Sequence, residues 1–193
     1  MTICLDPGHG GRDPGAVALN GARESALALL LARRMKEGLV RAGHRAVWTR
    51  TADQSLTLAE RVVAADREAS DLFISIHCNA GAPAASGVEW IVAKPDSRSR
   101  ALAERWEKAL LKRMNVKSRG VKSDTDTPRR RLYVLRENYR RRPAILIEAG
   151  FITNAADREL LEAPAYGLAL GDALAEALRG FEQKPQAGGR GGR

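Results

Sequence analysis

Residues 72–77 read Leu-Phe-Ile-Ser-Ile-His, a nearly continuous apolar run that ends in a histidine. Such a short run is typical of a strand that is buried on both faces of a parallel sheet. Residues 2–5 form a second apolar run, which stops at the turn-forming sequence Asp6-Pro7-Gly8. Between the two runs, the pattern predicts a helix at 24–40, a strand at 45–49 and a helix at 58–69. This β-α-β-α-β order predicts an α/β fold with a largely parallel sheet and helices on both faces.

The second half of the chain continues the alternation of strands and helices. Strands are predicted at 88–93, around Tyr133 and at 143–148, and helices at 98–114 and 166–181. Residues 115–131 are rich in Gly, Ser, Asp, Thr and basic residues, which predicts a surface loop. A chain of 193 residues fits a single domain, which we expect to span residues 1–181. Residues 182–193 are rich in glycine and end in arginine, which predicts a flexible basic tail.

The chain is basic, with 32 Lys and Arg against 23 Asp and Glu and a net charge of +9. Its surface should therefore attract polyanions, such as nucleic acid, anionic lipid or anionic cell wall. Only 5% of the residues are aromatic and no recognition motif is visible, so we expect no specific nucleic-acid partner. No apolar run approaches the ~18 residues of a membrane-spanning helix. The first residues also lack the basic and apolar segments of a secretory signal peptide.

Two of the three histidines, His9 and His77, follow apolar strands at their carboxyl ends. Ligands of open α/β sheets bind at this edge, and zinc is held in proteins by histidine nitrogens and carboxylate oxygens. His44 lies in the turn before the second strand, at the opposite edge, and is interpreted as a surface residue. For either His9 or His77 alone, a hydrogen-bonded structural histidine is the competing interpretation.

Glu148 ends the apolar run 144–147, which places a carboxylate inside the expected core. Burying an unpaired charge costs several kcal/mol, so a partner or a catalytic use is expected. One alternative is a salt bridge to one of the many arginines, and the other is a carboxylate beside a metal-bound water. Cys4 and Cys78 each lie in a predicted strand, which favours plain core packing over a disulfide or a metal role.

Five ordered motifs make the sequence resemble a known family. They are LDPGHGGRDPGAV (5–17) with Glu24 downstream, TRTAD (49–53) followed by LAERVVAAD (58–66), LFISIHCNA (72–80), RGVK (119–122) and ILIEAGFITNAAD (145–157). In order and spacing these motifs resemble the zinc-dependent N-acetylmuramoyl-L-alanine amidases of the amidase_3 type. The resemblance runs from about Thr2 to Phe181, which is nearly the whole chain.

The resemblance implies a site as well as a fold. It implies that His9, Glu24 and His77 bind one Zn²⁺ ion and that Glu148 acts as the general base and acid. It further implies a single domain with a twisted, mostly parallel six-stranded sheet flanked by helices. The implied partner is peptidoglycan, and the bond cut joins the lactyl group of N-acetylmuramic acid to L-alanine. Asn79 also matches a family position, for which the resemblance implies a substrate role.

The sequence departs from some members of this family. It shows no signal peptide and no separate wall-binding domain, and residues 80–87 are too few for the inhibitory helix that some relatives carry there. We therefore expect an open site, similar to a phage endolysin catalytic domain, in an endolysin or autolysin. We expect a monomer that is made in the cytoplasm and acts on the cell wall after release, with its basic surface near the anionic wall or outer membrane.

Three other functions remain open at this point. A degenerate amidase would bind peptidoglycan without cutting it, although all four implied side chains are intact. A nucleic-acid binder would account for the net charge of +9. A zinc peptidase would use similar ligands to cut a bond within the stem peptide, and the sequence does not rank the two bonds.

Overall fold

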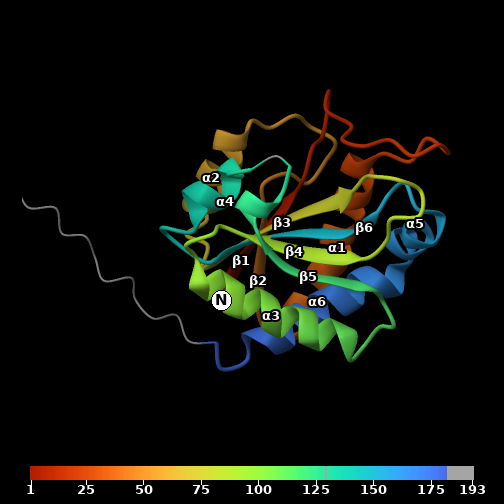
Figure 1. Ribbon diagram of the computed structural model, residues 1–193. Coiled ribbons are helices and arrows are strands. Elements are labelled where there is room, and N and C mark those ends of the chain that lie inside the picture. The colour runs from red at the N-terminus through yellow and green to blue at the C-terminus, as the bar shows by residue number, and fades with distance from the viewer. Residues whose placement is uncertain (129, 182–193) are drawn as a thin grey trace, which may run out of the picture.

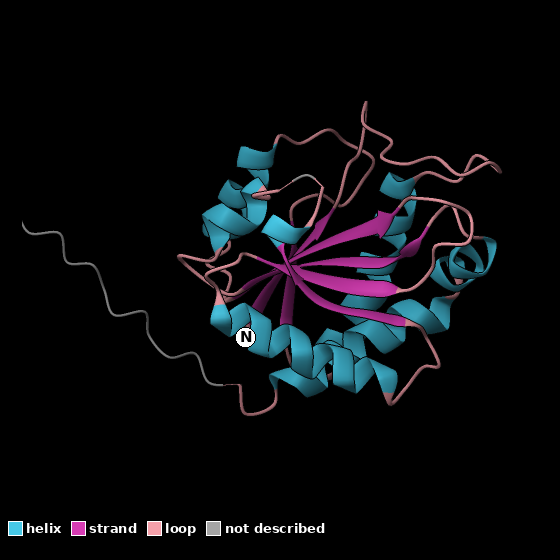
Figure 2. Ribbon diagram, in the orientation of Figure 1, coloured by secondary structure: helices cyan, strands magenta, loops and turns pink. Residues whose placement is uncertain are grey.

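A six-stranded sheet in the order β2-β1-β3-β6-β4-β5 forms the centre of the molecule (Figure 1). The computed structural model describes residues 1–128 and 130–181. The strands are β1 (Thr2–Pro7), β2 (Arg45–Trp48), β3 (Leu72–Asn79), β4 (Val88–Val92), β5 (Ser118–Ser123) and β6 (Ala144–Phe151). Every neighbouring pair is parallel except β4 and β6. The twist of the sheet is visible as a fan of strands in Figure 2.

Helices cover both faces of the sheet. They are α1 (Glu24–Arg41), α2 (Leu58–Arg67), α3 (Ser97–Leu111), α4 (Tyr133–Asn138), α5 (Ala155–Glu162) and α6 (Pro164–Leu178), with a short 3-10 turn at Asp124–Asp126. Helices α1, α3 and α6 pack together in one layer, and α2 and α4 pack together in another. None of the helices in the described part of the chain combines the length and apolarity needed to cross a membrane.

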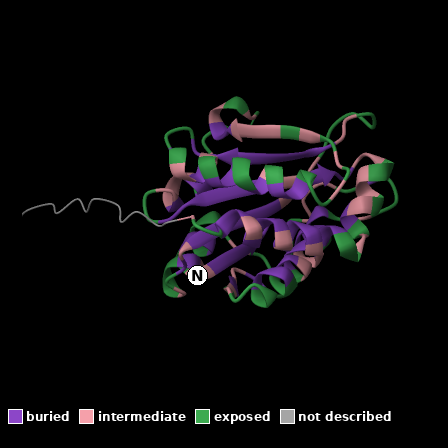
Figure 3. Ribbon diagram, turned by 90° about the horizontal axis from the view of Figure 1, so that it is seen from below, coloured by how far each residue is buried: buried purple, intermediate pink, exposed green. Residues whose placement is uncertain are grey.

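The four inner strands β1, β3, β6 and β4 are buried on both faces, as their apolar composition predicts (Figure 3). Along β3, Leu72, Ile74 and Ile76 point into the larger apolar cluster, whereas Phe73 belongs to the smaller cluster on the other face. This alternation has the period of two that a pleated strand imposes. The fold class predicted from the sequence, a single α/β domain with a mostly parallel six-stranded sheet, is therefore confirmed.

Three elements differ from the sequence-based prediction. Residues 115–131, expected as a loop, contain the edge strand β5, whose polar sequence Ser-Arg-Gly-Val-Lys-Ser gives no apolar signal. Tyr133, expected in a strand, is the first residue of helix α4. Helix α5 was not predicted, although the Asn154 side chain caps it by accepting a hydrogen bond from the Asp157 amide. The predicted tail, 182–193, lies outside the described residues.

Candidate metal centre

Three strand ends and one helix start meet at the carboxyl edge of the sheet. His9 follows β1, His77 lies near the end of β3, and Glu148 lies in the second half of β6. Glu24 is the first residue of α1, and this helix begins at the same edge. Because β1, β3 and β6 are neighbouring parallel strands, residues far apart in sequence are brought together there.

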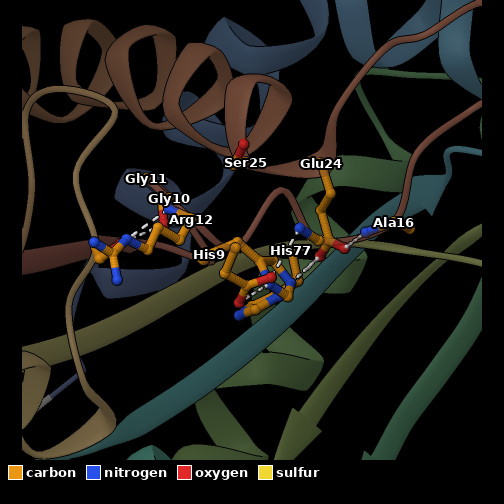
Figure 4. A network of polar contacts seen from close by, with 12 residues as sticks. His9, Gly10, Gly11, Arg12, Ala16, Glu24, Ser25 and His77 are labelled. Carbon is orange, nitrogen blue, oxygen red and sulfur yellow. Dashed lines mark hydrogen bonds and ion pairs between the residues drawn. The ribbon is translucent and has the colours of Figure 1, made fainter.

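The side chains of His9, Glu24 and His77 converge on one point (Figure 4). His9 Nε2 lies 3.0 Å and His77 Nδ1 lies 2.9 Å from the same oxygen, Glu24 Oε1. The candidate ligand atoms all lie within 4.8 Å of one another. Tetrahedral zinc with bonds of ~2.0–2.1 Å needs ligand atoms about 3.3 Å apart, so this donor set fits the ion with little rearrangement.

Asp13 holds His9 from the side opposite Glu24. His9 Nδ1 lies 2.8 Å from Asp13 Oδ2, and the Gly15 amide donates to Asp13 Oδ1 at 3.0 Å. A carboxylate on one ring nitrogen fixes the tautomer and leaves the other nitrogen for a metal. The sequence analysis missed this role, although Asp13 follows His9 by four residues within a quoted motif.

Glu24 is a buried carboxylate that stays ionised. Burial alone would raise the pKa of Glu24, but the hydrogen bonds and charges of His77 and His9 lower this pKa well below its ordinary value. Backbone amides of Ala16 and Cys78 donate to Oε2 and Oε1 at 2.9 and 3.1 Å. For His9, burial lowers the pKa, but Glu24 and Asp13 raise it more, so the net change is upward. The lowered pKa of Glu24 and the raised pKa of His9 both show that this site favours positive charge, as a metal centre requires.

The backbone around His9 adopts an unusual conformation. His9 has φ 58°, in the left-handed region that residues with a side chain rarely occupy. Gly8 lies so close to His77 that a Cβ atom there would be 2.2 Å from the ring. At Gly15, which has φ 67°, a Cβ atom would be 2.7 Å from both Glu24 and His9. Glycine at these two positions therefore allows the three side chains to meet.

Two buried arginines donate hydrogen bonds to the segment from Asp6 to His9. The Arg50 guanidinium donates to the carbonyls of Pro7 and Gly8 at 3.0 and 2.7 Å. The Arg61 guanidinium donates to Asp6 Oδ1 at 2.7 Å and to the carbonyl of His9 at 2.8 Å. Arg50 and Arg61 are only 2% and 4% exposed. Their charge-assisted bonds satisfy carbonyls that the turn leaves unpaired, a function that the sequence analysis did not assign.

The candidate ligands open into a cleft of about 1020 Å³. Glu148 lines this cleft beside His77, its register partner on β3. Asn79 lines it as well and donates from Nδ2 to Glu89 Oε1 at 3.1 Å. The position of Glu148, at the cleft surface next to the three converging side chains, suits a group that exchanges a proton with a bound water.

The remaining histidine and the two cysteines take no part in this cluster. His44 lies between α1 and β2, away from the cleft, and is half-buried rather than fully on the surface as predicted. Burial lowers the pKa of His44. Cys4 and Cys78 are free and buried in the two apolar clusters, which confirms the predicted core packing.

The sequence also matches a known protein family. Residues 3–180 match the family model described as N-acetylmuramoyl-L-alanine amidase (Amidase_3). The chain belongs to this amidase family. The predicted family resemblance is thereby confirmed over nearly the whole described chain.

Relatives in this family include proteins of several sizes. The chain is 35% identical over 182 residues to YqiI of Bacillus subtilis, covering 93% of this chain and 84% of that protein. It is 35% identical over 168 residues to the N-acetylmuramoyl-L-alanine amidase LytC of B. subtilis, covering 86% of this chain and 32% of LytC. The structure of AmiC2 of Nostoc punctiforme, 32% identical, superposes with a TM-score of 0.81 and covers 94% of this chain and 96% of its own.

Proposed function

We propose that this protein hydrolyses the amide bond between N-acetylmuramic acid and the L-alanine of the peptidoglycan stem peptide. The observation that carries the proposal is the convergence of His9, Glu24 and His77 beside Glu148 in one cleft, within a chain of the amidase family. Two nitrogens and one carboxylate oxygen are the donor set of many catalytic zinc sites. We therefore assign Zn²⁺ to these three side chains.

The residues of this chain divide the chemistry between them. Bound zinc would acidify a water molecule and polarise the scissile carbonyl. Glu148 takes one proton from the attacking water and delivers it to the amine that leaves with L-alanine. The carbon–nitrogen bond breaks as a carbon–oxygen bond forms, so one water is consumed, and a lactyl carboxylate and a free amine result. Asp13 keeps His9 in the tautomer that presents Nε2 to the metal.

The cleft is proposed to work without an activating partner. The connection from Asn79 to Val88 contains no helix, so no inhibitory helix of this segment covers the site. This arrangement suits a catalytic domain of an endolysin or autolysin, here residues 1–181, acting as a monomer. The net charge of +9 would favour contact with an anionic cell wall or outer-membrane surface. The protein would meet its substrate outside the cytoplasm.

Mass spectrometry of digested peptidoglycan tests the proposed bond. Purified, zinc-loaded protein is expected to release intact stem peptides that begin with L-alanine and to leave glycan strands without peptide. Fragments cut inside the stem would instead identify a peptidase, and binding without release would identify a non-catalytic binder. Preincubation with a zinc chelator should stop the release, and added zinc should restore it.

A further inference from the structure

On the cleft wall beyond Glu148, two cationic side chains contact one buried carboxylate. Glu89 on β4 is the register partner of Glu148, and its side chain is 7% exposed. Arg119 Nε and Lys122 Nζ lie 2.8 and 2.6 Å from the same oxygen, Glu89 Oε2. One carboxylate balances one of these two charges. The pair therefore leaves a surplus of one positive charge on the cleft wall.

Arg119 and Lys122 are also held in place at the cleft surface. Both line the cleft, and the side chain of each is 32% exposed. The Arg119 guanidinium lies 5.0 Å from the ring centre of Phe151, which adds a cation–π contact to the ion pair. Arg119, which is fixed by these two contacts, therefore loses little conformational entropy when it binds an anion.

Two further arginines increase the positive charge of this wall. Arg130 and Arg131 line the same cleft, and within residues 1–128 and 130–181 neither side chain forms an ion pair. Their φ angles are 36° and 55°, in the left-handed region. Residues with side chains are strained there, and such strained residues are often found at ligand-binding sites. Apart from the candidate metal centre with Asp13 and the proposed base Glu148, the carboxylates that line the cleft are Glu89 and Asp126. Four cations against two carboxylates leave a charge of +2.

We propose that this wall binds a carboxylate of the stem peptide on the leaving-group side of the scissile bond. The inference rests on the proposed amidase function, because it concerns the peptide that this reaction releases. β5, which carries Lys122, is two strands away from β6, or about 10 Å at the usual strand spacing. An extended peptide covers this distance in about three residues. The wall therefore selects stems that carry free carboxylates within their first three residues.

Two soluble muropeptides with the same three-residue stem test this subsite. One has all its stem carboxylates free, and the other has them converted to carboxamides. The wild-type protein is expected to show a KM about tenfold lower for the free acid, the effect of one charge-assisted hydrogen bond. Lys122→Gln should bring the two KM values together by raising only that of the free acid, with kcat little changed. Lys122→Arg should restore the preference.

Controls separate this role from a structural one. Lys108 on α3 is exposed and lies outside the cleft, so Lys108→Gln removes the same charge and should leave the preference intact. Arg131→Gln, at an exposed position, should weaken the preference without affecting folding. Equal cleavage of both muropeptides by the wild type, or equal loss on both in Lys122→Gln, would overturn the subsite while the amidase function stands. Cleavage of neither muropeptide by the wild type would overturn the amidase function itself.

Discussion

His77 on β3 and Glu148 on β6 are register partners on adjacent parallel strands. Directly paired residues point to the same face of a sheet, and the two strands lie about 4.8 Å apart. A candidate metal ligand and the proposed base are thus neighbours because of strand pairing rather than through a loop. The register changes immediately after His77, so that Asn79 pairs with Phe151 instead of following the regular ladder. Such irregularities are frequent beside active sites.

Gly8→Ala is expected to weaken zinc binding more than it weakens the fold. An added Cβ atom would lie 2.2 to 2.6 Å from atoms of the His77 ring, and the ring can escape only by turning its nitrogen away. We expect zinc affinity to fall about 10–100-fold, as when a supporting residue of a metal ligand is lost. Competition with a chromogenic chelator measures this affinity.

Gly21→Ala is the matched control for Gly8→Ala. Gly21 has φ 86° and no atom within 4 Å of a built Cβ, so alanine there costs backbone strain without touching the candidate ligands. Its zinc affinity should equal that of the wild type. Unchanged affinity in Gly8→Ala as well would mean that His77 is not held where the structure has it.

The sequence predicted the buried parts of the fold well. The apolar runs of β1, β3, β4 and β6 bury both faces, and such runs have few alternatives in a parallel sheet. The edge strand β5 was missed because its residues are polar and its pairing with β4 comes from tertiary contacts. Tyr133 was misplaced for a related reason, since α4 has only six residues and too few turns to show a period.

The candidate ligands could be named from sequence, but their support could not. His9, Glu24, His77 and Glu148 came from family motifs, and their roles stay predictions until metal and activity are measured. Arginines such as Arg50 and Arg61 look like solvent-exposed charges in a basic sequence. They are buried and donate to the carbonyls around His9 because the fold brings the segment after β2, with Arg50, and helix α2, with Arg61, next to the end of β1. Sequence patterns do not contain that long-range geometry.

Gly171→Ala should destabilise the protein although it improves helix propensity. Gly171 lies where α6 crosses α1, and an added Cβ atom would be 2.4 Å from the Met35 carbonyl oxygen. Helix propensity alone predicts a gain of about 1 kcal/mol, whereas overpacking costs about 1–3 kcal/mol. Urea unfolding should therefore show a lower free energy of unfolding. The exposed control Ala165→Ser should stay within about 0.5 kcal/mol of wild type, and a stabilised Gly171→Ala would refute the close crossing.

Neither cysteine should react in the folded protein. Burial, followed by the charge of Asp6, raises the pKa of Cys4, and burial followed by Glu24 raises the pKa of Cys78. Thiol reagents attack the thiolate, so the folded protein should be inert to them at pH 8. In guanidinium chloride, two thiols per chain should react. Rapid reaction of Cys78 that zinc suppresses would instead make Cys78 a metal ligand.

The same shifts of the cysteine pKa values set the direction of an alkaline effect. Both thiols have a raised pKa when folded, so the stability they contribute is present below the unfolded pKa of about 8.5. It is lost as the pH rises above that value, because only the unfolded chain then releases these protons. Unfolding curves between pH 7 and pH 10 should show falling stability. Replacing both cysteines with alanine should reduce the slope.

Purified protein should digest peptidoglycan without an added activator. The motivating feature is the connection from Asn79 to Val88, which contains no helix over the cleft. With zinc supplied, turbidity of a cell-wall suspension is expected to fall at a rate proportional to the protein concentration. A strict requirement for a second protein would show that another segment closes the cleft.

Metal binding and proton transfer can be separated by four preparations, namely wild type, His9→Ala, His77→Ala and Glu148→Gln. Either histidine variant removes one of three proposed ligands, so zinc content and activity should fall together. Glu148→Gln keeps the size and hydrogen-bonding capacity of the side chain but cannot accept a proton. Its activity should therefore fall by about 10²–10⁴-fold while its zinc content stays near that of the wild type.

The pattern across these preparations identifies the role of Glu148. Metal analysis and a turbidity assay on the same samples give both quantities, and a pull-down with insoluble peptidoglycan shows whether binding survives. If Glu148→Gln lost its zinc, Glu148 would be a ligand, and its place beside His77 in the strand register would have to be explained as metal coordination. If it kept full activity, the base would have to be another carboxylate of the cleft. Glu89 is then the next candidate to test, but its side chain is already held by Arg119 and Lys122. Glu89 also lies on β4, one strand further from His77 than Glu148 on β6, which is the geometric reason to test Glu148 first.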